Sequence, residues 1–207
     1  MKFKKPKFWD YKKISWKSIL LFPLSQVYLI FFLILKILVR LKKHKKTTIP
    51  IICVGNIYLG GTGKTPVVRE IFKITKSFGK NPAFIKKYYH YLSDEIKMLE
   101  KTGKVYVNKK RYDGIFLSAT DNHDVAILDD GFQDFSIEPS FSVLCFNSSQ
   151  MIGNGQLIPS GPLREGLGAI KRADCLIING DKNYDFEKKI YSIKKEIKIF
   201  YSNYKIK

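Results

Sequence analysis

The chain has 207 residues, and its 37 lysine and arginine residues against 18 acidic residues give a formal net charge of +19. This length accommodates one α/β domain with an appendage and is too short for two full-sized domains. Five of the basic residues are arginine, the side chain that makes bidentate contacts with bases and phosphates, so the composition argues against nucleic acid as a partner.

The first 46 residues combine positive charge with a long apolar run. They contain thirteen lysine or arginine residues against Asp10 alone, a net charge of +12. Residues Ile19–Val39 include sixteen Ile, Leu, Phe or Val side chains and would form a helix of about 31 Å. Each apolar side chain favours insertion by roughly 0.3–0.6 kcal/mol, against about 3 kcal/mol for Lys36, the single charge. We therefore predict a membrane-associating segment over 1–46 and a separate core over 47–207.

The sequence leaves the mode of membrane association open. Lysines flank both ends of the run, so a spanning helix would place positive charge on both sides of the bilayer. An in-plane or re-entrant segment would satisfy both ends, with Pro23, Ser25 and Gln26 interrupting the helix. A helix buried in a protein core is the third interpretation, although the run is long for one. Either membrane mode would keep the core on the cytoplasmic face.

A phosphate-binding motif follows in "NIYLGGTGKTP", residues 56–66. An apolar run, Ile49–Val54, precedes it and helical periodicity begins at Thr65, so we expect a strand, a glycine turn and a helix. In that setting backbone N–H groups face a phosphate, a lysine adds positive charge and a hydroxyl binds Mg²⁺. The residues in these roles are Gly60, Gly61, Thr62, Gly63, Lys64 and Thr65.

The motif departs from the usual pattern at one position. The glycine expected five residues before Gly63 is Tyr58, and Gly55, further back, would supply an earlier turn. The alternative is a plain strand-to-helix turn without a ligand.

Short strands and helices alternate along the rest of the chain. Strands are expected at 81–87, 104–107, 125–128, 141–146 and 175–180, with a helix at 93–103 and a glycine- and proline-rich loop at 153–168. Three cysteines fall inside apolar runs far apart, which indicates buried thiols rather than disulfides. This alternation is typical of an α/β fold, a P-loop NTPase-like, doubly wound, mostly parallel sheet with ligands at the carboxyl ends of its strands.

A second acidic motif ends the strand at 125–128. In "ILDDG", Asp129 lies at the tip of a buried strand, where an acid holds Mg²⁺ directly or through water. A strand followed by an ordinary Asp-Asp-Gly turn has the same sequence. Because the chain also carries Lys64 and Thr65 in a phosphate-binding motif, we favour the metal-binding interpretation.

Several stretches together resemble one family, the tetraacyldisaccharide 4′-kinases, which phosphorylate the lipid A precursor. These stretches are "VGNIYLGGTGKTP" at 54–66, "SDE" at 93–95, "ILDDGFQD" at 127–134, and "GNGQLIPSGPLRE" at 153–165 followed by "RADCLIING". The phosphate loop without its usual first glycine is typical of this family. The N-terminal segment is similar to the family's membrane-associating segment in character more than in residues.

The resemblance implies a role for each matching residue at the ATP end of the site. Lys64 would cradle the β- and γ-phosphates, and Thr65 and Asp129 would hold Mg²⁺. Asp130 and Gln133 would support the metal and the phosphates.

The resemblance also implies the acceptor end of the site, for a tetraacyldisaccharide 1-phosphate at the cytoplasmic face of the bacterial inner membrane. Asp94 matches the catalytic base that takes the proton of the sugar 4′-hydroxyl, and Glu95 matches a residue linked to metal and nucleotide binding. Arg164 matches a residue near the anionic reactants, where its charge would stabilise the transition state. Without the family, Asp94 and Glu95 would be ordinary acids in the first turn of a helix.

The sequence departs from the family in three places. Residues 85–88 read Ile-Lys-Lys-Tyr instead of Ser-Arg-Gly-Tyr, and residues 93–96 read Ser-Asp-Glu-Ile instead of Gly-Asp-Glu-Pro. The family continues beyond the equivalent of Lys207 into a second lobe with a histidine that pairs with the catalytic aspartate. Phosphotransfer by this chain is therefore a separate expectation from family membership.

Two alternatives stay open. A P-loop ATPase that dimerises across its nucleotides would carry a lysine directly before the Gly-Gly pair, where this chain has Leu59. The other alternative is a membrane-anchored nucleotide-binding protein without phosphotransfer, because the resemblance does not include the family's second lobe.

Overall fold

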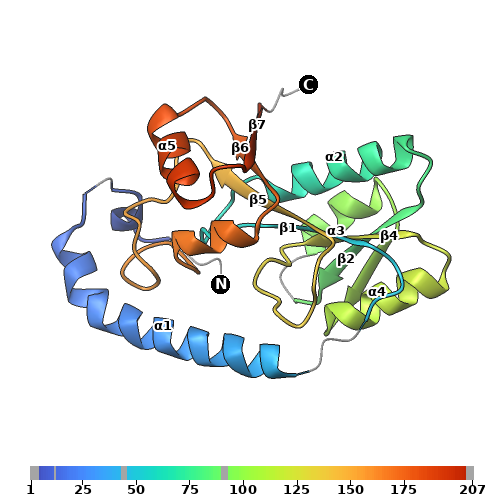
Figure 1. The fold of residues 1–207 in the computed structure, drawn as a ribbon, viewed down its shortest axis with the longest axis horizontal. Coiled ribbons are helices and arrows are strands. Elements are labelled where there is room, and N and C mark those ends of the chain that lie inside the picture. Colours follow the sequence, from blue (N-terminus) through green and yellow to red (C-terminus); the bar gives the residue numbers. More distant parts are fainter. Residues whose placement is uncertain (1–4, 12, 43–45, 90–92, 204–207) are drawn as a thin grey trace. The chain divides into compact units, whose positions relative to one another are not determined.

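The computed structural model describes residues 5–11, 13–42, 46–89 and 93–203, and Figure 1 shows their fold. The chain divides into two compact units, one made of residues 1–41, 56–62 and 144–207, the other of residues 42–55 and 63–143. Within the described residues, seven strands form one sheet in the order β3-β2-β4-β1-β5-β6-β7. Strands and helices alternate along most of the chain, so the predicted α/β class is confirmed.

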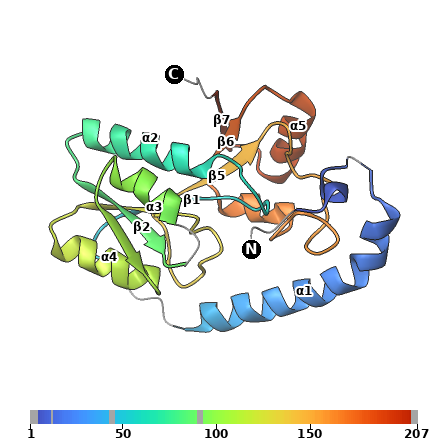
Figure 2. The same cartoon turned by 180° about the vertical axis from the view of Figure 1, so that it is seen from behind.

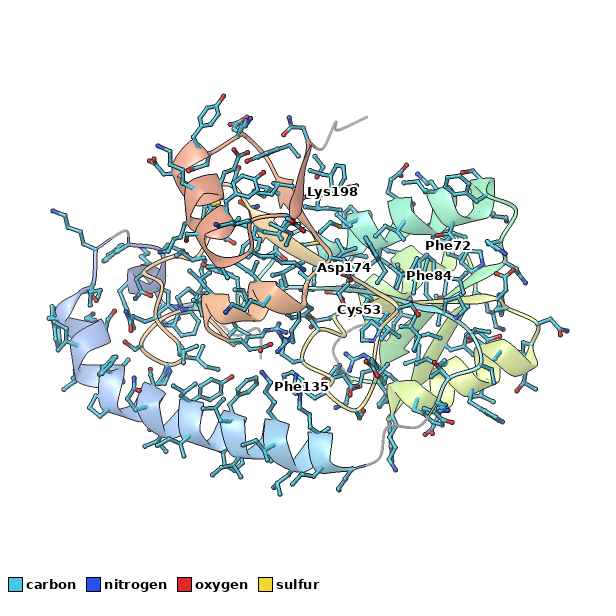
Figure 3. The ribbon with its side chains drawn as sticks, in the orientation of Figure 1. Cys53, Phe72, Phe84, Phe135, Asp174 and Lys198 are labelled. Atoms are coloured by element: carbon cyan, nitrogen blue, oxygen red, sulfur yellow. The ribbon has the colours of Figure 1, made fainter. Side chains whose placement is uncertain are left out.

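The described part of the second unit contains four complete parallel strands and three helices. Its elements are β1 (Ile51–Gly55), α2 (Lys64–Ser77), β2 (Pro82–Lys87), α3 (Ser93–Glu100), β3 (Val105–Asn108), α4 (Arg111–Thr120) and β4 (Val125–Asp129). β1 pairs with β4, and β2 pairs with both β4 and β3, all in parallel. Helix α2 covers this sheet with Val67, Val68 and Phe72, and Phe72 stacks on Phe84 of β2 with ring centroids 4.5 Å apart (Figure 3).

The first unit contains the chain's N-terminal and C-terminal parts. Its elements are η1 (Lys7–Asp10), α1 (Trp16–Leu41), η2 (Leu167–Arg172), β6 (Cys175–Asn179), α5 (Tyr184–Ile193) and β7 (Lys198–Ser202). Strand β5 (Phe141–Asn147) begins in the second unit and ends in the first. β6 and β7 pair in parallel, and Phe146 meets Phe186 of α5 edge to face at 5.1 Å. The three cysteines, Cys53, Cys145 and Cys175, are buried thiols, as predicted.

Helix α1 runs without a break through the apolar segment, as Figure 2 shows from behind. The expectation that Pro23, Ser25 and Gln26 interrupt it is wrong. A proline removes one backbone donor, and this loss near the start of a 26-residue helix leaves the rest of the hydrogen-bond ladder in place. The Ser25 hydroxyl instead contacts the loop at 153–165, as described below.

Most of α1 is exposed, so it is not a core helix. Its most apolar 18-residue window is 11% buried, and its two buried residues are Ser18 and Ser25. Leu20 is 71% exposed and Phe31 is 61% exposed. Among the described residues, α1 is the one helix that is long and apolar enough to cross a membrane, by length and composition only.

Candidate active site

Three parallel strands of the second unit end at the same edge of the sheet. In the strand register, Val54 of β1 and Lys86 of β2 both lie opposite Asp129 at the end of β4. The segments that follow these strands therefore start side by side. In an open α/β sheet, this carboxyl edge is where ligands bind.

Lys64 and Asp130 meet at this edge. The Lys64 ammonium lies 3.5 Å from Oδ1 of Asp130, so the phosphate loop and the acidic turn converge as the sequence predicted. Lys64 is the first residue of α2, and Gly63 before it has a φ of 77°, a left-handed conformation that favours glycine. The N–H groups in the first turn of such a helix have no intrahelical acceptor, and with the helix dipole they form an anion site.

The earlier half of the loop belongs to the first unit and is shaped by two asparagines. Asn56 donates from Nδ2 to the Tyr58 carbonyl at 2.7 Å and to the Thr62 hydroxyl at 2.9 Å, and Asn179 donates to the Thr62 carbonyl at 2.5 Å. Around Gly61, the position of a Cβ atom has no neighbouring atom within 4 Å. This open backbone fits the close approach of a phosphate chain.

Tyr58 occupies the place of the usual first glycine and is fully buried. Its hydroxyl donates to Asp10 and accepts from the Lys5 ammonium at 2.8 Å. Burial and the hydrogen bond to Asp10 raise the pKa of Tyr58. The segment around Tyr58 also pairs with the loop at 153–165, through Leu59 N–H to the Pro162 carbonyl at 2.8 Å and Arg164 N–H to the Ile57 carbonyl at 2.7 Å.

Gly55 serves a different purpose from the one predicted. It ends β1 without a positive φ, so it does not supply a glycine-dependent turn. A Cβ on Gly55 would lie 2.4 Å from the Cβ of Phe132. The glycine is required there because the segment after β4 packs directly on the backbone.

Asp130 is held by an arginine that the sequence did not single out. Asp130 has a φ of 59°, and its carbonyl accepts a hydrogen bond from Nη2 of Arg111 at 2.6 Å. Nη1 of Arg111 pairs with Asp134 at 3.0 Å. Arg111 begins α4 and is 7% exposed, although in the sequence it belongs to a basic run that looks solvated.

Asp129 is buried and paired with a lysine. Lys86 of β2, 2% exposed, contacts Oδ2 of Asp129, and its ammonium also lies 2.7 Å from Oε2 of Glu95. Burial raises the pKa of Asp129, and the ammonium groups of Lys86 and Lys64 oppose that shift. Burial lowers the pKa of Lys86, but the carboxylates of Asp129 and Glu95 more than offset this and raise it.

The donor set at this edge fits Mg²⁺ as a P-loop protein binds it. Mg²⁺ prefers oxygen ligands and takes one or two from the protein, with the rest from phosphates and water. Thr65 would offer a hydroxyl and Asp129 its second carboxylate oxygen. Among the described residues, no three His, Cys, Asp or Glu side chains are grouped so that they could hold a metal ion by themselves.

The remaining predicted residues lie on three segments. Asp94, which is exposed, and Glu95 are in the first turn of α3, and Gln133 follows the acidic turn after β4. Arg164 lies in the first unit, in the loop that pairs with residues 57–59. The structure therefore brings Lys64, Asp130, Asp129 and Glu95 into one network with Lys86. The role of each predicted site residue stays a prediction.

Comparisons with known proteins identify the family of the chain. The model of the tetraacyldisaccharide-1-P 4′-kinase family matches residues 17–92 and 86–206. The chain is 42% identical over 201 residues to the tetraacyldisaccharide 4′-kinase of Pelagibacter ubique. This match covers 96% of this chain and 60% of that protein. It is 32% identical over 193 residues to the tetraacyldisaccharide 4′-kinase of Rhizobium meliloti, covering 83% of this chain and 54% of that protein.

A solved structure is similar over most of the fold. LpxK from Aquifex aeolicus, in a crystal form described as apo and in complex with ATP, superposes with a TM-score of 0.72 at 26% identity. The match covers 89% of this chain and 64% of that one. The chain thus spans between half and two thirds of the length of these relatives.

Proposed function

Because the chain belongs to the tetraacyldisaccharide-1-P 4′-kinase family, we propose that it transfers the γ-phosphate of ATP to the 4′-hydroxyl of a tetraacyldisaccharide 1-phosphate, the lipid A precursor. The observation that supports this most directly is the approach of Lys64 to Asp130 at 3.5 Å, on the sheet edge where Asp129 also lies. A phosphate loop and a strand-end acid at one edge are the two parts that a P-loop kinase needs.

The phosphate loop would bind the triphosphate. Gly60, Gly61, Thr62 and Gly63 would offer backbone N–H groups, and Lys64 would move its ammonium from Asp130 toward the β- and γ-phosphates. Thr65 and Asp129 would hold Mg²⁺, which neutralises charge on the phosphate oxygens when it is bound. Arg111 would keep Asp130 in place through the carbonyl contact at 2.6 Å, with Gln133 as further support.

The acceptor hydroxyl would react in line with the γ-phosphorus. Its oxygen forms a bond to phosphorus while the bond from phosphorus to the β-bridging oxygen breaks and ADP leaves with that electron pair. Asp94 would take the hydroxyl proton, with Glu95 beside it oriented by Lys86, and Arg164 would stabilise negative charge on the transferred group.

The substrate is a lipid, and α1 is the element suited to meet it. The first thirteen residues of α1 are hydrogen-bonded to the rest of the first unit through Ser18, Ser25 and Tyr28. For example, the Tyr28 hydroxyl donates to the Arg164 carbonyl at 2.8 Å. The residues after Tyr28 would give a helix of about 20 Å, less than the roughly 30 Å of a bilayer core. This favours α1 lying in the plane of the cytoplasmic membrane face over a single span.

Phosphotransfer from labelled ATP to the tetraacyldisaccharide 1-phosphate in detergent or vesicles tests the proposal. We expect Lys64→Ala and Asp94→Ala to lower kcat/KM by about 10²-fold or more, because charge stabilisation and proton removal each contribute at least that much. Lys73→Ala is the matched control, since Lys73 is an exposed lysine on α2 that pairs with Glu70. Equal product from the parent and both site variants would refute the assignment.

A nucleotide-binding protein without phosphotransfer is the second candidate. The observation that favours it is that the chain covers 60% of its Pelagibacter ubique relative. Saturable binding of ATP and Mg²⁺ that is lost in Lys64→Ala, together with no labelled lipid from the parent chain, would support this candidate over the kinase.

A further inference from the structure

Lys86 is a buried cation in the middle of an apolar strand. It is 2% exposed, and β2 is otherwise made of Pro82, Ala83, Phe84, Ile85 and the partly exposed Lys87. A buried ammonium is costly unless it is paired and hydrogen-bonded. Lys86 has two such partners, Oδ2 of Asp129 and Oε2 of Glu95 at 2.7 Å.

The two partners come from different parts of the site. Asp129 ends β4 directly opposite Lys86 in the strand register, on the side predicted to hold the metal. Glu95 is in the first turn of α3, next to Asp94, the predicted base. Helix α3 is anchored toward its other end by Leu99, which is fully buried. The Lys86–Glu95 pair therefore holds the end of α3 that Leu99 does not.

We propose that Lys86 is a positioning residue that ties the first turn of α3 to the strand-end acid Asp129 and so sets the placement of Asp94 relative to the phosphates. This inference rests on the proposed function for its catalytic consequence, but the tie itself is a property of the unliganded chain. Lys86 acts through Glu95 and Asp129 and touches no reacting atom.

The first test measures amide hydrogen exchange in α3 without any ligand. We expect the amides of residues 93–100 to exchange about tenfold faster in Glu95→Gln and in Lys86→Met than in the parent, because either change removes the ionic tie. Lys87→Met, at the next position of the same strand, is the matched control and should leave α3 unchanged. Exchange in α2 should be unchanged in all of them.

Glu95→Gln keeps the experiment decisive if Lys86→Met does not fold. Glu95 has a side chain that is 47% exposed, and its replacement leaves the buried Lys86–Asp129 pair intact. Parent-like exchange of α3 in Glu95→Gln would overturn the proposal regardless of how Lys86→Met behaves.

The second test separates positioning from general stability through kinetics. We expect Lys86→Met to lower kcat about 10²-fold with a change in KM for ATP of less than about threefold, because a small displacement of a catalytic group costs this much while the phosphate loop is untouched. Lys86→Arg, which keeps the charge, should stay within about tenfold of the parent. The kcat of the double variant Lys86→Met/Glu95→Gln should be no lower than that of the less active single variant, because both changes break the same interaction.

The outcomes distinguish this inference from the proposed function. A parent chain without phosphotransfer would refute the kinase proposal while the exchange measurements still decide whether the tie exists. An active parent in which α3 is equally protected in all variants, or in which the two single effects on kcat multiply, would refute the role of Lys86 alone.

Discussion

Tyr58 links the phosphate loop to the start of the chain. Its hydroxyl joins Asp10 and Lys5, which also pair with each other at 2.7 Å. Trp9, between them, is buried and donates from Nε1 to the Pro159 carbonyl at 2.9 Å. The residues before α1 are therefore part of the support of the loop. Tyr58 can replace the usual glycine because hydrogen bonds of its hydroxyl hold the phosphate loop at this position, where other P-loops have a tight glycine turn.

We predict that Tyr58→Phe lowers the free energy of unfolding by about 1–2 kcal/mol, because a partly buried hydrogen bond to a charged group is lost. Chemical denaturation followed by circular dichroism measures this. Tyr11→Phe is the control, since Tyr11 lies next to η1 and is 52% exposed. Equal stability of the two variants would show that the Tyr58 hydroxyl does not support the fold.

The same hydroxyl predicts a dependence on pH. Burial and Asp10 raise the pKa of Tyr58, so the folded chain favours the neutral phenol. A raised pKa in the folded state gives stability that is fully present below the unfolded pKa of about 10 and is lost as the pH rises above it. The stability difference between the parent and Tyr58→Phe should therefore shrink above pH 10, as denaturation at several pH values would reveal.

At the scale of elements, α1 has two chemically different sides. One is polar and attached, with Ser18 accepting from Asn154 Nδ2 at 3.0 Å and Ser25 joining the Leu157 carbonyl and the Ser160 N–H, each at 3.0 Å. The other is apolar and exposed. The small serine side chains let the loop at 153–165 approach α1 closely and form hydrogen bonds with it. A helix with only apolar side chains would offer no such partners.

We predict opposite effects for variants on the two sides of α1. Ser25→Ala should lower the free energy of unfolding by about 1–3 kcal/mol, because two backbone groups lose a buried partner, and should leave vesicle binding unchanged. Phe31→Asp, at a position 61% exposed, should reduce vesicle binding more than tenfold without changing stability. Vesicle sedimentation and thermal unfolding measure the two effects, and the reverse pattern would contradict the assignment of sides.

Helices α4 and α5 and strand β7 were not predicted from the sequence, and α4 and β7 depend on packing and pairing with their neighbours. Helix α4 contains Gly114, a residue that weakens a helix, and a Cβ there would come within 3.1 Å of side-chain atoms of Asn108 and Ile85, so a larger residue would require these neighbours to shift by a few tenths of an ångström. Strand β7 has no fully buried residue and is defined by its pairing with β6. Helix α5 carried a readable signal, the Asn183 cap that accepts from Phe186 N–H at 2.9 Å.

At the scale of the whole molecule, most of the positive charge lies in residues 1–46, which also include the apolar helix α1. The first 46 residues account for +12 of the net charge of +19. Each lysine or arginine near an anionic bilayer contributes about 1 kcal/mol at low salt, and this attraction falls within a Debye length. The membrane-associating segment over 1–46 and the core over 47–207 stay a prediction about organisation, which binding experiments on the full chain address.

We predict that the full chain binds vesicles containing anionic lipid at least tenfold more strongly than neutral vesicles, and that raising the salt from 0.05 to 0.5 M removes most of this difference. Flotation of the chain with vesicles of defined composition measures both. Binding that is independent of lipid charge and salt would show that the apolar side of α1 alone accounts for membrane affinity.

The sequence alone was sufficient to predict the α/β fold class, the strand, loop and helix around Gly63, the acidic turn at the end of β4 and the long apolar segment of α1, because each depends on local patterns of residues. The family resemblance added the candidate base and acceptor residues. The tertiary structure decided the interactions of these residues across the fold: the pairing of Lys86 with Asp129 and Glu95, the contact of Arg111 with Asp130, and the attachment of Tyr58 to Asp10. Such contacts join residues distant in sequence, and a lysine in a strand or an arginine in a basic run does not reveal that it will be buried beside a carboxylate.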